Sequence, residues 1–263
     1  MYINKLQIGD HFVLVSTNDE SVHQWTSIHF KVINQDLWGV TAPDMYINIH
    51  KGYGVPFIDF NVQIRKEGDL VLYERADFLL ETISTYREAK LQVHDELALK
   101  HGLMTLFSAF IVHHGWGLMI HSSCIVSDDK AYLFAGPSGA GKSTVAMLSK
   151  PREILSDEAT LIKIEPDAIV AYDSPFRSDS VSNYDKKSRK LAGIHLLEQS
   201  PHIERIPIPP AETVLRLMDK IFYWAHTPAD TLKVLGMCRK IAQQVSGYRL
   251  KFQKNDLFWE RIS

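Results

Sequence analysis

The most chemically specific stretch of the chain is Gly136–Thr144, which reads GPSGAGKST and is called the glycine-rich loop below. It matches G-x-x-x-x-G-K-[ST], the pattern of loops that hold the phosphates of a nucleoside triphosphate. Glycines let the backbone fold tightly and point amide N–H groups at phosphate oxygens, and the helix expected after the loop directs its positive end to the same place. The residues expected to bind nucleotide are Gly136, Ser138, Gly139, Ala140, Gly141, Lys142, Ser143 and Thr144.

Within this loop, Lys142 is placed to reach the β- and γ-phosphates, and the Ser143 hydroxyl is placed to coordinate Mg²⁺. The pattern therefore predicts ATP and Mg²⁺ as the bound molecules. A glycine-rich turn without a ligand is the plain alternative, and the position of the loop between an expected strand and an expected helix disfavours it.

Two carboxylates follow about one helix length after the loop, at Asp157 and Glu158, which are called the acidic pair below. Phosphoryl transfer needs a carboxylate near the γ-phosphate, either to hold Mg²⁺ or to accept the proton of the attacking hydroxyl. A solvated pair at the end of a strand is common, but the loop just upstream favours the functional reading.

The elements that must position these groups follow from short apolar runs. Residues 121–126 and 131–135 flank Asp128-Asp129 and predict a hairpin that leads straight into the loop. Beyond the loop we expect a helix at 143–149, strands at 154–158, 159–164, 168–172 and 191–199, and largely helical structure over 211–246 with a break at Thr227-Pro228.

The N-terminal portion is rich in Val, Ile, Phe and Tyr and predicts strands, at 11–16, 27–33, 37–42, 46–50, 59–64 and 69–74. Residues 81–99 are polar and favour a helix continuing to about Val112. We therefore expect an α/β protein with a β-rich domain over residues 1–95, which could dock a substrate, and a catalytic domain over residues 96–263.

Composition narrows the class further. Hydrophobic residues make up 45% and charged residues 23% of the 263, as in an ordinary globular protein. The net charge of −2 argues against a broad nucleic-acid-binding surface. The two cysteines make no disulfide framework, and the N-terminus has no signal-peptide pattern, so we expect reduced thiols and a cytoplasmic location.

Residues 102–120 carry no charged side chain other than histidine and are nearly long enough to cross a bilayer. Gly115 and Gly117 would weaken a membrane helix, so a buried helix running into a turn and a strand is the better interpretation. We expect no membrane partner.

Other candidate residues are weaker. Arg177 opens a polar segment, 177–190, and could stabilise the charge of a transferred phosphoryl group or receive a peptide carboxylate, although a solvated loop is the simpler reading. His113, His114 and His121 lack accompanying residues at ligand spacing, so a zinc site is not expected.

Together these residues resemble a known family. The strand beginning His121-Ser122-Ser123, the hairpin, GPSGAGKST and Leu155–Glu158 are similar to the C-terminal catalytic domain of HPr kinase/phosphorylase, whose fold group includes phosphoenolpyruvate carboxykinase. The tail looks like HPr-kinase-like proteins of bacterial peptide biosynthetic clusters, some of which are lasso-peptide precursor kinases, at 174–176, 193–200 and 258–259. The likeness covers about residues 100–263.

The resemblance implies a P-loop kinase domain with a mixed sheet and a set of roles. Asp157 corresponds to the base that takes the serine proton, and Glu158 stands where the family has a second aspartate and would support the metal. His121 corresponds to the family histidine near the phosphates, although a core histidine is an equal alternative. The family's glycine- and arginine-rich signature after the acidic pair is missing, which speaks against the reverse, phosphorylase reaction and against HPr as substrate.

The function expected from these residues is an ATP-dependent serine kinase that phosphorylates a peptide, in particular the C-terminal serine of a precursor peptide. A kinase for a small hydroxylated metabolite such as free serine would use the same site. A nucleotide-binding sensor or assembly subunit that transfers nothing is the third reading, and a homo-oligomer is compatible with all three.

Overall fold

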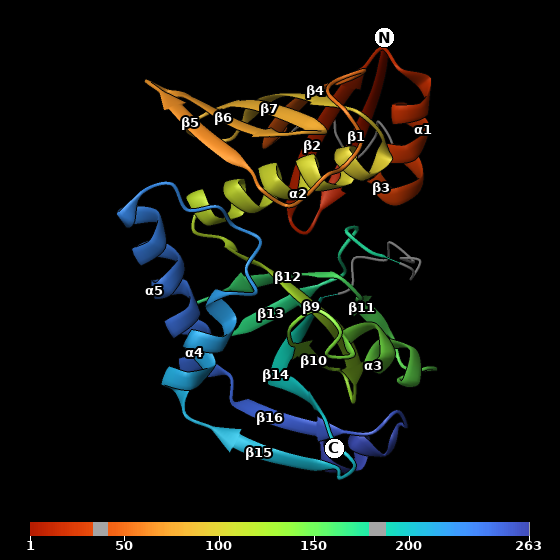
Figure 1. The fold of residues 1–263 in the computed structure, drawn as a ribbon, viewed down its shortest axis with the longest axis vertical. Helices are drawn as coiled ribbons and strands as arrows, with labels where there is room; N and C mark the ends of the chain where they lie inside the picture. Colours follow the sequence, from red (N-terminus) through yellow and green to blue (C-terminus); the bar gives the residue numbers. More distant parts are fainter. Residues whose placement is uncertain (34–41, 179–187, 263) are drawn as a thin grey trace. The chain divides into compact units, whose positions relative to one another are not determined.

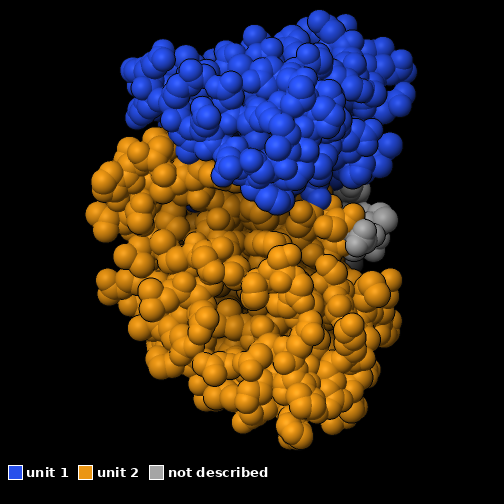
Figure 2. All heavy atoms as spheres, in the orientation of Figure 1, with its two compact units in different colours: residues 1–114 blue, residues 115–263 orange. Residues whose placement is uncertain are grey.

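The computed structural model describes residues 1–33, 42–178 and 188–262 and shows a mixed α/β protein (Figure 1). It has two compact units, residues 1–114 and residues 115–263 (Figure 2). The expected boundary at residue 95 lies before helix α2 (Glu96–His113), whereas the unit boundary lies after it. The difference arises because α2 packs against strands of the first unit.

In the described residues of the first unit, eight strands form one mixed sheet in the order β3-β1-β2-β4-β8-β7-β6-β5. The β2–β4 and β4–β8 pairs are parallel and the others are antiparallel. The strands are β1 (Tyr2–Ile8), β2 (His11–Thr17), β3 (Lys31–Val32), β4 (Met45–Lys51), β5 (Gln63–Glu67), β6 (Leu70–Arg75), β7 (Phe78–Ile83) and β8 (Glu88–Val93). The expected β-rich N-terminal portion is therefore present.

Three predictions about this portion were wrong. The strand predicted at 59–64 begins only at Gln63, the first residue of β5. Part of the strand predicted at 27–33 belongs to helix α1 (Glu20–His29), which begins where the Asp19 carboxylate accepts the Val22 N–H at 3.1 Å. The helix predicted from residue 81 begins only at α2, because β7 and β8 alternate buried and exposed side chains as a half-buried sheet requires. Most of the strand predicted at 37–42 lies outside the described residues.

Helices α1 and α2 cover this sheet: α1 packs on β1 and β2, and α2 packs on β7 and β8. Most of the residues of α2 are buried, including the run from Gly102 to Val112, so the apolar stretch at 102–120 is core helix followed by a strand. None of the helices in the described parts of the chain is long and apolar enough to cross a membrane.

The described residues of the second unit also form an eight-stranded sheet, in the order β10-β9-β12-β13-β14-β16-β15, with β11 paired to β9 and a further β10–β14 pairing. The strands are β9 (Gly117–Ser127), β10 (Lys130–Ala135), β11 (Ile154–Ser156), β12 (Ala159–Ile164), β13 (Ile169–Tyr172), β14 (Ser188–Gln199), β15 (Glu204–Ile208) and β16 (Gly247–Phe252). The strands predicted at 159–164, 168–172 and 191–199 are confirmed. The strand predicted at 154–158 ends at Ser156, just before the acidic pair, and β15 and β16 were not predicted.

The predicted hairpin is also confirmed. β9 and β10 pair antiparallel from Ser127↔Lys130 to Ser122↔Ala135. Asp128 and Asp129 form the turn with φ values of 49° and 58°, the left-handed conformation that a two-residue hairpin turn requires. The first half of β9 pairs with β12 and the second half with both β10 and β11, so this one strand has three partners.

Helix α3 (Lys142–Leu148) follows the glycine-rich loop, and α4 (Pro210–Met218) and α5 (Pro228–Gln244) lie near the C-terminus, before β16 and a final 3₁₀ turn (Leu257–Arg261). Helix was predicted to continue from 211 to 225, but α4 ends at Met218. The chain beyond it pairs with β9 instead, where the Lys220 carbonyl accepts the His121 N–H at 2.6 Å.

One histidine is enclosed in the core of the second unit. His195 on β14 is fully buried, its ring stacks on Phe134 and Tyr248 at centroid distances of 5.1 and 5.4 Å, and its Nε2 accepts the Arg205 Nε–H at 3.1 Å. Burial, and secondly the nearby positive charge of Arg205, lowers the pKa of His195 to about 3. The ring is therefore neutral in the folded protein.

The first prediction concerns acid stability. Unfolded His195 takes up a proton below its ordinary pKa near 6.5 while the folded form stays neutral to about pH 3, so stability is lost as the pH falls through this window. In His195→Gln this contribution disappears, and urea unfolding should show a decline in unfolding free energy shallower by roughly 1 kcal/mol per pH unit. The exposed His202→Gln is the control, and equal slopes in wild type and His195→Gln would contradict the assignment.

Candidate functional site

The glycine-rich loop has the backbone conformation that its sequence predicts. Gly139 and Gly141 have φ values of 77° and 105°, which side chains other than glycine rarely adopt. A Cβ on Gly141 would lie 2.7 Å from Cζ of Phe252, and one on Gly136 would lie 2.7 Å from Cβ of Ala140. A side chain at position 136 or 141 would therefore crowd its neighbours. At position 139 there is space for a Cβ, so glycine is favoured there by the backbone conformation alone.

Lys142 curls back over this loop. Its side chain is largely buried, and its Nζ donates to the carbonyls of Gly136 and Pro137 at 3.1 and 3.2 Å. Burial, and then the charge of Lys220, lowers the pKa of Lys142. A buried ammonium held by two neutral carbonyls would gain energy from an anionic partner. Of the other predicted nucleotide contacts, Ser138 and Ser143 are exposed and Thr144 is half-buried.

Two adjacent serines on β9 connect the loop to the acidic pair. The Ser123 hydroxyl donates to the Lys142 carbonyl at 3.0 Å, which fixes the start of α3. The Ser122 N–H donates to the Glu158 carbonyl at 3.0 Å, and the Ser122 carbonyl accepts the Ser156 hydroxyl at 3.4 Å. Because β9 pairs with β10 on one edge and with β11 and β12 on the other, it brings the loop and the acidic pair to one site.

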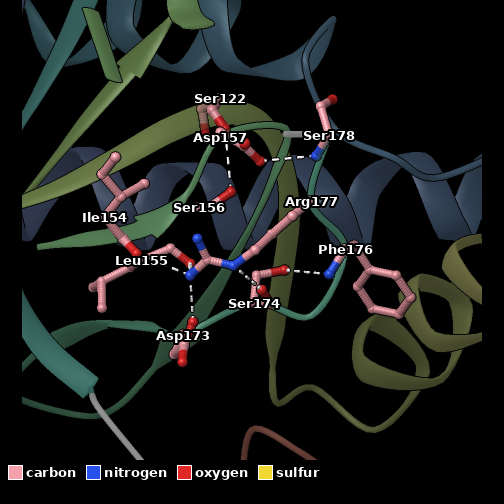
Figure 3. A network of polar contacts seen from close by, with 10 residues as sticks. All are labelled: Ser122, Ile154, Leu155, Ser156, Asp157, Asp173, Ser174, Phe176, Arg177 and Ser178. Atoms are coloured by element: carbon pink, nitrogen blue, oxygen red, sulfur yellow. Dashed lines mark hydrogen bonds and ion pairs between the residues drawn. The ribbon is translucent and has the colours of Figure 1, made fainter. Parts of the chain in front are cut away.

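The carboxylates of the acidic pair both meet Ser178, a residue that the sequence did not single out. Asp157 is only 7% exposed and its Oδ1 accepts the Ser178 N–H at 2.9 Å (Figure 3). The half-buried Glu158 accepts the Ser178 hydroxyl through Oε2 at 2.9 Å. These two bonds hold both carboxylates beside one residue.

Arg177 supports the strand that carries the acidic pair. Its Nη2 lies 2.9 Å from the carbonyls of both Ile154 and Leu155 on β11 and also pairs with Asp173 (Figure 3). Its Nε donates to the Ser174 carbonyl at 2.8 Å. The guanidinium is thus engaged with main chain, which differs from the expected contact with a transferred phosphoryl group. In this position Arg177 orients the end of β11.

His121 on β9 and Lys220 in the segment after α4 are close enough to Lys142 for their charges to interact. The Lys220 Nζ pairs with Asp219 Oδ2 at 2.6 Å. The centre of the His121 ring lies 5.4 Å from that of the Phe222 ring. The His121 N–H donates a hydrogen bond to the Lys220 carbonyl. Burial lowers the pKa of His121, followed by the charges of Lys142 and Lys220, while Glu158 opposes the shift. Lys220 was missed because it was expected inside a helix, and the residue-type pattern carries no signal for the bend that brings it here.

Few side chains at this site could coordinate a metal ion. Within the described ranges, no three His, Cys, Asp or Glu side chains gather as a metal cage. Mg²⁺ is commonly held by one or two carboxylates together with substrate phosphates, and it prefers oxygen ligands. The two carboxylates that converge on Ser178, together with the exposed Ser143 hydroxyl, fit that donor set.

Comparison with known proteins places the chain in a family. Residues 88–263, about two thirds of the chain, match the family described as SynChlorMet cassette protein ScmC, and the chain belongs to this family. A search of curated protein sequences found no match. The match to this family does not confirm the expected likeness to lasso-peptide precursor kinases.

Among solved structures, the Hpr(Ser) kinase/phosphatase from Coxiella burnetii matches with 10% identity and a TM-score of 0.30. The match covers 55% of this chain and 96% of that chain. A likeness at this level leaves the activity to be argued from the residues of the chain itself.

The second prediction tests the support given by Arg177. Its side chain and that of Asp173 are 6% and 14% exposed, so Arg177→Ala removes a cationic partner from the largely buried Asp173 carboxylate and a donor from three carbonyls. The unfolding free energy should fall by about 3–5 kcal/mol in urea titrations.

The control is a second ion pair with the same i,i+4 spacing, Arg216–Glu212, in which Arg216 is 62% exposed. Arg216→Ala should cost less than about 1 kcal/mol. Equal losses in the two variants would show that the Arg177 contacts contribute no more than a surface pair.

Proposed function

We propose that this protein is an ATP-dependent kinase that transfers the γ-phosphoryl group to a serine hydroxyl of a peptide. The observation that carries the proposal is the pair of β9 serines, which bond the start of α3 on one side and the acidic pair on the other. A lysine-bearing glycine-rich loop and a buried carboxylate held at one site are the groups that phosphoryl transfer requires.

In the proposed reaction Asp157 accepts the proton of the acceptor hydroxyl, whose oxygen forms a bond to the γ-phosphorus. The bond from that phosphorus to the β,γ-bridging oxygen breaks, and ADP leaves. Lys142 and Lys220 offset the charge on the phosphates. His121 is neutral near pH 7 because its pKa is lowered, so it can donate or accept a hydrogen bond but adds no charge.

Mg²⁺ would be held by Ser143, Asp157 and Glu158 and, when bound, would neutralise charge on the β- and γ-phosphates. The roles of the remaining residues are to bind and orient. Ser178 holds both carboxylates of the acidic pair, and Arg177 fixes the strand from which they project. Catalysis then depends on positioning more than on covalent chemistry with the protein.

A peptide acceptor is supported by the resemblance of the hairpin, the loop and the acidic pair to kinases that act on serine in a polypeptide. The first unit offers a surface for such a substrate. An open hollow of about 580 Å³ on its sheet is lined by both polar and apolar side chains, among them Tyr46, Asn48, Leu70, Glu81 and Lys90.

The third prediction is that Lys142→Ala and Asp157→Asn each abolish transfer. Each variant would be incubated with Mg²⁺, ATP and synthetic peptides that end in serine, and intact-mass spectrometry would detect the gain of about 80 Da per phosphoryl group. Lys142→Ala removes the cation at the phosphates, whereas Asp157→Asn keeps the shape but cannot take the proton.

The matched controls are Lys240→Ala and Asp167→Asn, both at exposed positions, which should phosphorylate at the wild-type rate. Near-normal transfer by Asp157→Asn would remove that residue as the base. Phosphorylation of free serine but of no peptide would indicate a metabolite kinase, and ATP binding without any phosphorylated product would indicate a sensor.

The fourth prediction concerns Lys220. If its ammonium offsets charge that develops during transfer, Lys220→Ala should slow single-turnover transfer by about 10²-fold or more, as loss of one such donor does in other enzymes. The Kd for ATP should change far less than the rate. An unchanged rate, with Lys240→Ala again as the control, would exclude Lys220 from the reaction.

A further inference from the structure

We propose that the open cavity beside the glycine-rich loop, at the ends of β14 and β16, binds the base and sugar of the nucleotide. This inference rests on the proposed function and adds to it the nucleoside subsite. Apart from the loop, the residues of this subsite had no role in binding predicted from the sequence, although Ser200 falls within the 193–200 segment of the family likeness.

The sheet topology directs the cavity to the loop. β10 runs parallel to β14, and β14 runs parallel to β16, with Ala135 beside Leu196 and Gln199 beside Phe252. The carboxyl ends of the three strands therefore meet at one edge of the sheet, the usual place for ligands in α/β folds. The glycine-rich loop leaves the first of these ends, and the cavity lies at the other two.

The cavity has the size and lining of a nucleoside site. Its volume is about 410 Å³, within the range of small-molecule pockets, and its wall includes Gly141 and Thr144 of the loop, so a bound phosphate chain could continue into it. The ends of β14 and β16 and the residues after them also line the cavity, including Ser200, Pro201, Phe252, Gln253 and Lys254. Apolar rings beside amide, hydroxyl and ammonium groups suit a heterocyclic base and a ribose.

The position of the acidic pair excludes the opposite assignment, in which the cavity would hold the acceptor. In this part of the sheet the local order is β11-β9-β10-β14-β16, so the acidic pair follows a strand on one side of β10 and the cavity lies on the other side. A triphosphate on the loop would direct its γ-phosphate toward the acidic pair. Its nucleoside end then points toward β14 and β16.

The strand ends are also tied to each other and to the loop, which favours a preformed site. The Ser200 N–H donates to the Phe252 carbonyl at 3.1 Å, and the Gln253 amide donates to the Pro201 carbonyl. The Gln199 amide donates to the Gly139 carbonyl at 2.9 Å. A ligand that contacts this wall would thus slow local opening of the same segments.

The fifth prediction compares ATP with inorganic tripolyphosphate, which has the phosphate chain but no nucleoside. In hydrogen-exchange mass spectrometry of the wild-type protein with Mg²⁺, both ligands should protect the glycine-rich loop, and ATP alone should protect residues 199–201 and 252–254. Equal protection of those segments by both ligands, or by neither while ATP binds, would overturn the inference.

A variant gives an independent measure. Ser200→Leu fills the cavity with apolar volume and should raise the Kd for ATP at least about tenfold while changing that for tripolyphosphate by less than about twofold. His202→Leu, two residues along and exposed outside the cavity, is the control and should leave both values unchanged. If the Kd of ATP is the same in both variants and wild type, the nucleoside lies elsewhere.

These measurements separate the inference from the proposed function. ATP bound with wild-type affinity by Ser200→Leu but lost in Lys142→Ala would overturn the subsite and leave the kinase proposal standing. A wild-type protein that binds neither ATP nor tripolyphosphate would overturn both.

Discussion

The pairing of β9 with three other strands is the constraint on which the rest of the second unit depends. Its second half lies between β10 and β11, and its first half pairs with β12. The glycine-rich loop follows β10 and the acidic pair connects β11 to β12, so both ends of the candidate site are bonded to one strand. Ser122 and Ser123 on β9 add side-chain and main-chain hydrogen bonds to these segments. Arg177 hydrogen-bonds to main-chain carbonyls of β11.

The charges at the site are arranged at an energetic cost that a ligand could relieve. Lys142 and His121 are both partly desolvated, and the pKa of each is lowered by burial and by Lys220. The Lys220 ammonium pairs with the Asp219 carboxylate at 2.6 Å, whereas the Lys142 ammonium is held by two neutral carbonyls. A largely buried ammonium held by neutral groups gains energy from an anionic partner. Bound polyphosphate would supply that anion, which is why this arrangement supports a nucleotide site and why burial by itself, as at His195, does not.

The sheet also determines which way an elongated ligand on the loop would point. The loop stands at the centre of a row of strands, with carboxylates on one side and the cavity of β14 and β16 on the other. An elongated ligand on the loop therefore meets two chemically different ends. Reactive groups gather at one end and apolar rings at the other, which corresponds to the two ends of a nucleoside triphosphate.

The sequence by itself determined the local features. These are the hairpin with Asp128 and Asp129 at its tip, the loop after β10, the succession of strands along the chain from β11 to β14, and the burial of α2. These follow from turn chemistry, glycine placement and runs of apolar residues, which act over a few neighbouring positions. Only the tertiary structure decided that Ser178 holds the acidic pair, that Arg177 binds the carbonyls of β11, and that Lys220 lies beside His121. Each of these contacts joins segments well separated along the chain, and such pairings are set by strand register and burial, to which local residue preferences give no access.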